Sequence, residues 1–294
     1  MPAVCFSVDF SQHKLYMLVL KDSPENAEYI TRGISPLLNG SAQDFAEVIQ
    51  TELKDALSAL APVTLHCALP QEFVGLDIAV VPALGKSQTA DALKTELASQ
   101  FKGTAQDFEI KDTPLHSDKL HSYFLLLITP QKLLSRISSA CSTAKFPLKG
   151  LTFGGAAVAN AAMLLRPELQ KRSVIVVNVG ESRTTFSSCK AGKLRGAGAL
   201  PIGFSHLSAF TDAASCAVAF APVLRHIAAL RQEHSTHSAL TPADEVLVSI
   251  PARFNFLLEN TGVSAFNLPE SLQGALDLYG AAQNYAPNKL YSLL

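Results

Sequence analysis

The sequence predicts an α/β protein built as two lobes with a cleft between them. Strand-like and helix-like patterns alternate along the chain, which is typical of layered α/β architectures. Each half of the chain opens with a β-hairpin pattern, at residues 4–21 and again at residues 173–203. Hydrophobic residues make up 48% of the 294 residues and charged residues only 17%. The chain therefore has enough apolar side chains for a large core, sized for about two domains.

The first hairpin places Asp9 at the end of its first strand. After it, Ser41 is expected to cap a helix with Asp44 in its first turn, and an apolar stripe follows at helical spacing until Pro62. The elements expected here are strands at 4–9, 15–21 and 63–69, a loop and a third strand within 22–32, and a helix at 41–60. Together they predict one lobe with its own sheet.

A different unit begins at Pro70 and extends to about Lys149, with a ββαββα-like order. Thr129 is expected to cap its last helix, with Pro130 at the first helical position, where its missing N–H costs nothing. The expected elements are strands at 73–81, 107–111 and 123–128, helices at 88–101 and 130–147, and a polar loop at 112–122.

The second half is organised around the hairpin at residues 173–203, with Gly180, Glu181, Ser182 and Arg183 in its first turn. The strands expected there are 174–179, 184–190 and 193–199. After it we expect helices at 205–218, 222–233 and 252–261, strands at 244–250 and 266–268, and a closing helix at 272–283. The small-residue helix at 155–165 has two interpretations, a hinge helix packed against the closing helix or an ordinary core helix.

Composition limits the classes of function. A net charge of -1 gives no electrostatic basis for nucleic-acid binding. The five cysteines are scattered, odd in number and without a CxxC pair, which favours a reducing compartment. The N-terminus has no basic segment before an apolar run, and no apolar run approaches the length of a membrane span. These observations predict a cytoplasmic protein.

Motifs for several chemistries are missing from the sequence. No GxSxG elbow, no GxxxxGK[ST] loop and no strand-linked GxGxxG occurs. His234 and His237 have HxxH spacing, but their Ser- and Thr-rich surroundings favour a surface loop over a metal site. Asp9 has two interpretations, a carboxylate that holds a metal through water or a cap for its own turn. The turn at 180–184 either binds an anion through backbone groups or is an ordinary hairpin turn.

Five stretches together resemble the PilM family of type IV pilus assembly, whose relative is FtsA. Val8 to Ser11 lies where that family has its first phosphate loop, and SVIVVNVGESRTTFSSCKAGKLRGAGALPIG is similar to its second. The other three are LHCALPQEFVGLDIAVVPAL, SYFLLLITPQKLLSRISSACSTAKFPLKGLTF and LQGALDLYGAAQ. The similarity covers nearly the whole chain but follows the order of elements rather than an invariant motif.

The resemblance implies a two-lobed actin-like (ribonuclease H-like) fold with an inserted 1C-type subdomain and a reduced or absent 2B subdomain. Lobe 1 would comprise residues 1–69 and 150–172. The 1C-like subdomain would comprise residues 70–149. Lobe 2 would comprise residues 173–294, with the helix at 272–283 at the interlobe hinge.

Departures from the family pattern predict a degenerate nucleotide site. Asn178 stands where the family usually has an Asp, and Ser11 stands where it has a Gly. Pro251 lies where actin-like proteins place a Gly-Gly turn, and residues 203–244 are short for a full 2B subdomain. The degenerate positions are Asp9, Ser11, Asn178, Gly180, Glu181 and Thr184. Glu181 would also repel a phosphate, and Arg183 offsets this only in part. We therefore expect no catalytic residue, no metal and no cofactor.

The function implied by the resemblance is a non-catalytic cytoplasmic scaffold recruited to the inner membrane. Its partner would be a short cytoplasmic peptide of a PilN-like inner-membrane protein, held between the 1A and 1C subdomains. The alternatives are an ATP-binding, filament-forming protein like FtsA, a GspL-like secretion component, and a sugar kinase of the same superfamily. The apolar C-terminal residues 290–294 are expected to pack against a neighbouring copy or their own lobe.

Overall fold

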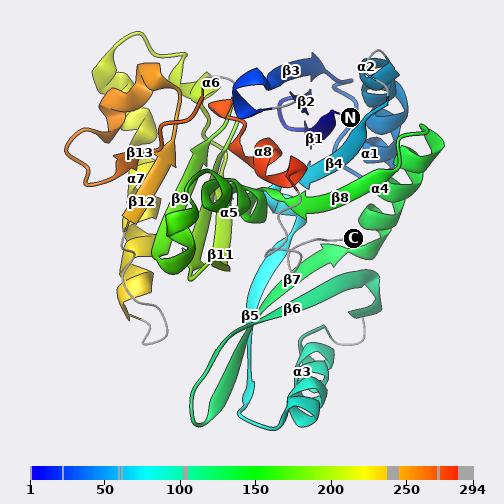
Figure 1. Ribbon diagram of the computed structural model, residues 1–294, viewed down its shortest axis with the longest axis vertical. Coiled ribbons are helices and arrows are strands. Elements are labelled where there is room, and N and C mark those ends of the chain that lie inside the picture. Colours follow the sequence, from blue (N-terminus) through cyan, green and yellow to red (C-terminus); the bar gives the residue numbers. More distant parts are fainter. Residues whose placement is uncertain are drawn as a thin grey trace.

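The computed structural model describes residues 2–21, 23–58, 60, 62–101, 105–236, 245–269 and 272–283. Two five-stranded sheets form two lobes that lie side by side, and a three-stranded sheet extends below them (Figure 1). The C-terminal residues 290–294 and His237 lie outside the described residues.

The first sheet has the strand order β3-β2-β1-β4-β8. Its strands are β1 (Ala3–Asp9), β2 (Lys14–Leu20), β3 (Glu28–Gly33), β4 (Thr64–Leu69) and β8 (Leu148–Phe153). The first three strands are antiparallel, whereas β4 and β8 run parallel to β1. The hairpin, the third strand and the strand expected at 63–69 are confirmed.

The helix expected at 41–60 is present and includes a π turn. Its parts are α1 (Ala42–Val48), a π segment (Ile49–Leu53) and α2 (Lys54–Ser58). Ser41 and Asp44 form the expected capping box, with Asp44 N donating to Ser41 Oγ at 3.2 Å and Ser41 N donating to Asp44 Oδ2 at 2.9 Å. The helix α4 (Gln131–Thr143) packs beside α1.

The second sheet repeats the topology of the first, with the strand order β11-β10-β9-β12-β13. Its strands are β9 (Ser173–Val179), β10 (Thr184–Lys190), β11 (Lys193–Leu200), β12 (Glu245–Ser249) and β13 (Ser264–Ala265). Ala191 and Gly192 both have positive φ, which is the backbone of a two-residue turn that matches the twist of a hairpin. Every residue of β9 is buried, because this central strand is covered on both faces.

Two helices pack against each other between the lobes (Figure 1). They are α5 (Gly154–Leu165) and α8 (Leu276–Ala282). A Cβ added to Gly280 would lie 1.8 Å from the carbonyl oxygen of Ala157, so the helices approach closely only because residue 280 is glycine. Of the two interpretations of the small-residue helix, the structure shows the one in which it packs against the closing helix.

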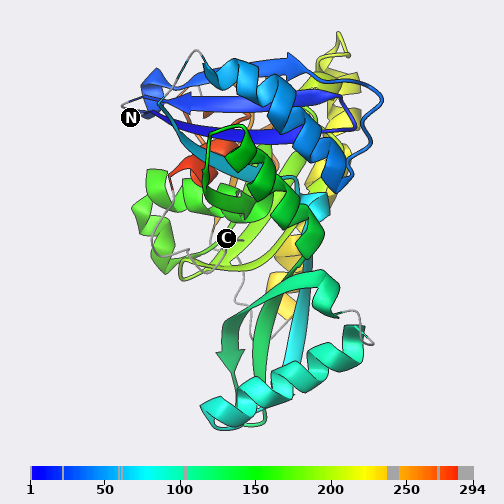
Figure 2. The ribbon, with the colours of Figure 1, turned by 90° about the vertical axis from the view of Figure 1, so that its right-hand side faces the viewer.

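The third sheet has the order β5-β7-β6 and a small core of its own. It contains β5 (Gly75–Pro82), β6 (Phe108–Ser117) and β7 (His121–Pro130), and α3 (Lys86–Phe101) covers one of its faces (Figure 2). That core consists of Ala79, Val81, Leu93 and Leu126.

The prediction of a polar loop at 112–122 is wrong, because most of these residues extend the β6–β7 hairpin. Asp118 closes the hairpin by accepting the backbone N–H groups of Leu120 and His121, each at 2.7 Å. The expected cap at Thr129 is also wrong. Thr129 still belongs to β7, and Pro130 is the residue that precedes α4. Polar residues at a long hairpin tip look like a loop in sequence because they face solvent.

Lobe 2 contains one long helix where two were expected. A short helix, α6 (Phe204–Leu207), precedes α7 (Ala213–Thr236), which continues through Pro222. Asp212 caps α7, since its Oδ1 accepts the Ser215 N–H at 2.8 Å. The described residues between β11 and α7 contain no strand, in agreement with a reduced 2B subdomain.

The composition of α7 contradicts the expectation that no segment approaches the length of a membrane span. Its segment Ala213–Gln232 has a mean hydropathy of 1.6 and is long and apolar enough to cross a membrane by these two criteria alone. In the fold, α7 contributes a buried stripe, Cys216, Phe220, Val223 and Ile227, to the core of lobe 2. This stripe explains the apolar character of one face of the helix.

Three of the elements predicted for lobe 2 differ from the structure in their bounds or type. The helix expected at 252–261 is a 3-10 helix (Ala252–Leu258). The strand expected at 266–268 lies earlier, as β13. The closing helix begins at Leu276 rather than at residue 272. Each error concerns an element boundary or helix type, and the order of elements is as predicted.

Candidate functional site

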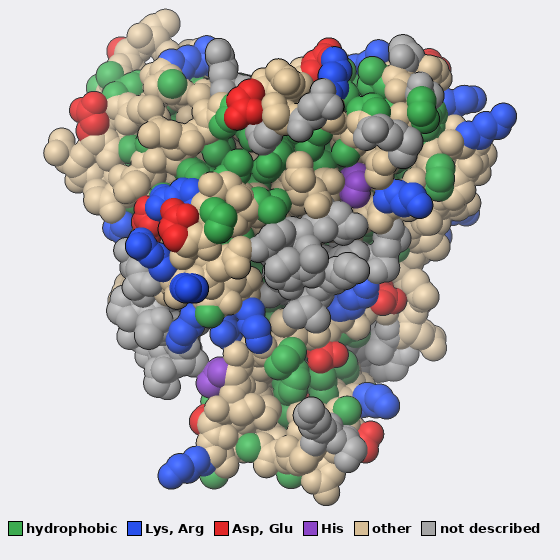
Figure 3. All heavy atoms as spheres, in the orientation of Figure 1, with side chains coloured by type: hydrophobic (Ala, Val, Ile, Leu, Met, Phe, Trp, Pro, Cys, Tyr) green, Lys and Arg blue, Asp and Glu red, His purple; other side chains and the backbone are tan. Residues whose placement is uncertain are grey.

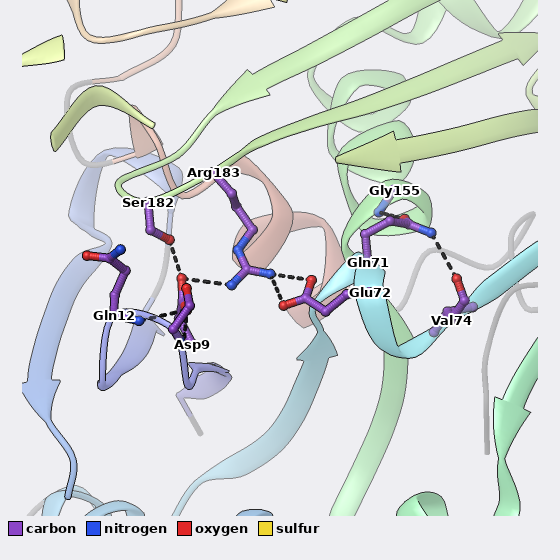
Figure 4. Close-up of polar contacts among 9 residues, drawn as sticks. Asp9, Gln12, Gln71, Glu72, Val74, Gly155, Ser182 and Arg183 are labelled. Atoms are coloured by element: carbon purple, nitrogen blue, oxygen red, sulfur yellow. Dashed lines mark hydrogen bonds and ion pairs between the residues drawn. The ribbon is translucent and has the colours of Figure 1, made fainter. Parts of the chain in front are cut away.

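Two turns face each other between the lobes, one after β1 and one after β9 (Figure 4). Asp9 ends β1 and is 2% exposed. Its Oδ1 accepts the backbone N–H groups of Ser11 at 2.9 Å and Gln12 at 3.1 Å, and the hydroxyl of Ser11 at 2.6 Å. One oxygen of Asp9 therefore caps its own turn.

The second oxygen of Asp9 binds the opposite lobe. Its Oδ2 accepts a hydrogen bond from the hydroxyl of Ser182 and pairs with Nη2 of Arg183 at 2.7 Å (Figure 4). The guanidinium of Arg183 also pairs with Glu72, in the segment between β4 and β5. A separate ion pair joins Lys14 on β2 to Glu181. The turn of lobe 2 is thus tied to lobe 1 by charged groups of the protein itself.

The pKa values follow from this arrangement. Burial alone would raise the pKa of Asp9, but the charge of Arg183 and the hydrogen bonds from Arg183, Ser11 and Ser182 lower it to about 2. Burial acts to lower the pKa of Arg183, but Glu72 and Asp9 outweigh it and the pKa is raised. Both groups of the central pair are therefore charged throughout the neutral range.

Asn178 and Asp277 form a second buried polar pair behind this cluster. Nδ2 of Asn178 lies 3.5 Å from Oδ1 of Asp277, at the start of α8. Asn178 is 2% exposed, and its Oδ1 has no partner within the described part of the chain. Burial raises the pKa of Asp277 to about 6, although the N–H of Leu278 and the charge of Arg183 oppose this.

The space left between the two turns is a cavity of about 30 Å³. That is room for roughly one or two water molecules, whereas pockets for organic ligands measure about 300–1,000 Å³. Four of the expected site residues line it, namely Asp9, Asn178, Gly180 and Glu181. Ser182 of the turn at 180–184 lines it as well, together with Asp277 and Gln71, which were not predicted from the sequence. A signal existed for Asp277, which is the only acidic residue in the otherwise apolar stretch LDLYGAA.

Backbone and hydroxyl groups of the turn at 180–184 also have protein partners. The N–H of Gly180 donates to the carbonyl oxygen of Arg183 at 2.9 Å, as in an ordinary hairpin turn. The carbonyl oxygen of Glu181 accepts both the N–H of Ser205 at 3.0 Å and its hydroxyl at 2.6 Å. Thr184 donates its hydroxyl to the carbonyl oxygen of Ile202 at 2.6 Å, outside the cavity. The N–H of Gly180 and the hydroxyl of Thr184 therefore stabilise the hairpin itself.

The turn after β12 lacks the Gly-Gly pair that actin-like proteins have there. Polar groups of this turn also form hydrogen bonds within the protein. The N–H of Ala252 donates to Oε1 of Gln273 at 3.2 Å, and Nη2 of Arg253 donates to the hydroxyl of Ser208 at 2.9 Å. No group of three or more His, Cys, Asp or Glu side chains placed to hold a metal occurs among the residues described.

A larger groove of about 540 Å³ opens beside the cavity. It lies where the two lobes and the third sheet meet, and it shares Asp9, Gln71, Ser182 and Arg183 with the cavity. Ser11 and Glu72 line only the groove. Its remaining lining residues are Gln12, Val74, Leu76, Ala197, Ala199, Leu200 and Pro201. The wall of the groove thus combines six apolar residues with seven polar or charged ones, and the Arg183 ion pairs lie where the groove meets the cavity.

No protein-family model matches the chain, and no curated protein matches it in sequence. Among solved structures, a PilM-PilN type IV pilus biogenesis complex matches with a TM-score of 0.64 and 14% identity, over 96% of this chain and 97% of that one. The chain has the two-lobed actin-like fold. At this level of identity the similarity establishes the fold alone.

Two further structures share this actin-like fold over almost their whole length. The cytoplasmic domain of EpsL, an inner-membrane component of the type II secretion system of Vibrio cholerae, matches with a TM-score of 0.56 and 10% identity, over 97% of this chain and 96% of that one. A polyphosphate/ATP-glucomannokinase from Arthrobacter matches with a TM-score of 0.54 and 12% identity, over 98% and 99%. Because the actin-like fold occurs in pilus and secretion components and in a kinase, function must be argued from the site.

Proposed function

We propose that the chain is a non-catalytic scaffold in a pilus or secretion assembly platform, and that its interlobe site does not bind a nucleotide. The observation that carries this is the position of Arg183 between Asp9 and Glu72. In the actin-like proteins that this chain resembles, phosphate and a divalent ion lie between the corresponding two turns. Here a guanidinium supplies the positive charge that a bound ion would otherwise bring.

The electrostatics of the cavity also oppose a nucleotide. Three carboxylates line it, those of Asp9, Glu181 and Asp277, against the one guanidinium of Arg183. A triphosphate entering this space would meet a net negative lining, and the Asn at 178 lacks the carboxylate that organises metal-bound water in the related proteins. It would also have to compete with Arg183 for the buried carboxylate of Asp9 and its surroundings.

The proposed partner is a short cytoplasmic peptide of a PilN-like inner-membrane protein, which would recruit this protein from the cytoplasm to the inner membrane. The fold shared with the PilM-PilN complex and with EpsL supports an assembly role in either a pilus or a secretion system. The three-stranded sheet supports a division into lobe 1 (1–69 and 150–172), a 1C-like unit (70–149) and lobe 2 (173–294), since it has a core of its own. An open groove with apolar residues such as Val74, Leu76 and Leu200 in its wall supports peptide capture.

Two titrations test the proposal. The cytoplasmic segment of the inner-membrane partner, titrated calorimetrically into the full chain, is expected to bind. A fluorescent ATP analogue with magnesium is expected to show no binding at micromolar concentrations. Absence of peptide binding at high micromolar concentration would count against the scaffold role, and clear micromolar ATP affinity would favour the FtsA-like or kinase alternatives.

A further inference from the structure

Two edge strands contribute lining residues to the groove. β11 is the last strand of the second sheet and β5 is the last strand of the third, and no strand among the described residues pairs with the outer edge of either. Ala197, Ala199 and Leu200 of β11 line the groove, as does Leu76 of β5. Among the described residues, both strands therefore keep an outer edge with backbone groups that a further strand could pair with.

The C-terminal part of β11, after Lys193, Arg195 and the bulge, lacks the features that usually protect an exposed strand. Its segment 196–200 reads Gly-Ala-Gly-Ala-Leu, without charge or proline, and the bulge in its pairing with β10 lies before Gly196. A Cβ added to Gly196 would meet nothing within 4 Å, and one added to Gly198 would meet only Nε2 of His226 at 3.9 Å. Residues 196–200 are all partly exposed, and their side chains are mostly small.

The charge of the lining indicates which peptide the groove fits. Its ionisable residues are Asp9, Glu72 and Arg183, two carboxylates against one guanidinium. Glu72 has 52% of its side chain exposed, so it can bind a second cation besides Arg183. Val74, Leu76 and Leu200 offer apolar contacts nearby. This combination fits an extended apolar segment that carries Lys or Arg.

We propose that an extended apolar peptide segment bearing a Lys or Arg enters this groove as an added strand, pairing with β11 and placing its basic side chain beside Glu72. The inference rests on the proposed peptide-binding function and names its site and its ligand chemistry. Strand addition supplies affinity through backbone hydrogen bonds, while the groove selects side chains. Cytoplasmic segments next to membrane spans are rich in Lys and Arg, so the tail of an inner-membrane partner has the required charge.

The test uses overlapping synthetic peptides that tile the cytoplasmic segment of the partner, titrated into the full chain. The tightest peptide is then N-methylated on alternate residues in two complementary sets. Because only every second N–H of a strand faces one neighbour, one set is expected to lose at least about tenfold in affinity and the other to keep it. Equal affinities for the two sets would overturn strand addition.

Two protein variants locate the site. Glu72→Lys is expected to weaken binding by about tenfold, whereas Glu47→Lys, on the exposed side of α1, is expected to have no effect. A photo-crosslinking residue at position 199 should capture the peptide, and one at Leu120, on the distant hairpin tip and 72% exposed, should not. A peptide that binds but ignores Glu72→Lys and crosslinks elsewhere overturns this inference and leaves the scaffold proposal standing. If no peptide binds, the scaffold proposal itself fails.

Discussion

The interlobe cavity and the neighbouring groove share four lining residues but differ in size and chemistry. The cavity measures about 30 Å³, while the groove measures about 540 Å³ and adds apolar residues from β5 and β11 to its polar wall. The difference arises at Arg183, which binds Asp9 and Glu72 across the lobes. A site that satisfies its charges internally has little left to offer a charged ligand, whereas the groove beside it keeps accessible backbone and apolar surface.

The two regions also differ from the rest of the surface. Acidic and basic side chains are interspersed on the face shown in Figure 3, without a large area of one sign. On this face the distribution agrees with the net charge of -1. The charged groups that bind specific partners across the lobes lie instead in the cluster around Arg183. Variants of that cluster therefore test the comparison most directly.

The largest effect is expected for Arg183→Ala, which leaves the carboxylate of Asp9 buried without its counter-charge. We expect a loss of about 3–5 kcal/mol in the free energy of unfolding, measured by urea denaturation at pH 7. The double variant Asp9→Asn with Arg183→Met is expected to recover most of this loss, since it removes both charges and Asn keeps an oxygen for the turn. A single variant as stable as the original protein would show that the cavity is not held closed by this pair.

The sequence predicted the two lobes because their strands are specified locally. The β-branched run of β9, the turn at Ala191 and Gly192, and the capping box at Ser41 are short-range signals that the structure confirms. The prediction of two helices in place of α7 is wrong. It treats Pro222 as the start of a second helix and does not use Asp212, which caps the single helix that continues through Pro222. The predicted helix boundaries are wrong where two local signals in the sequence conflict and the weaker one is followed.

The contacts of the candidate site could not be predicted from sequence in the same way. Ser182 and Asp9 are 173 positions apart, and Arg183 and Glu72 are 111 apart, so no local pattern relates them. The sequence analysis selected Asp9 and Glu181 from the resemblance, but it did not pair them with Arg183 and Lys14. Only the three-dimensional structure shows that the charges of the two turns neutralise each other.

An intermediate effect is expected for Asp277→Asn, which tests the deeper part of the cavity. The folded pKa of Asp277 is raised to about 6, above its ordinary value of 3.8, so the folded state holds a proton that the unfolded state releases between these values. Stability contributed by this group is therefore present below about pH 4 and is lost as the pH rises toward about 6. The variant is expected to gain about 2–3 kcal/mol at pH 7 and to lose this part of the pH dependence.

Urea denaturation from pH 4 to 7 measures this difference between the original protein and Asp277→Asn. The charged neighbours to consider are Arg183, which opposes the shift of Asp277, and Cys5, whose own pKa is raised by burial and by Asp277. Parallel pH profiles of the two proteins would mean that Asp277 titrates normally. In that case the cavity would be more hydrated than its small volume indicates.

The smallest effect is expected for Lys14→Ala, which removes the second interlobe ion pair. Lys14 keeps 35% of its side chain exposed and Glu181 keeps 16%, so water screens this pair more than the pair of Asp9 and Arg183. We expect a loss of about 0.5–1 kcal/mol at low salt, measured by urea denaturation, which decreases further at high salt. Arg183→Ala should instead remain strongly destabilising at high salt, because burial shields its contacts from ions. If the two variants had equal effects with equal salt dependence, the closure of the cavity would come from surface charge in general and not from one buried guanidinium.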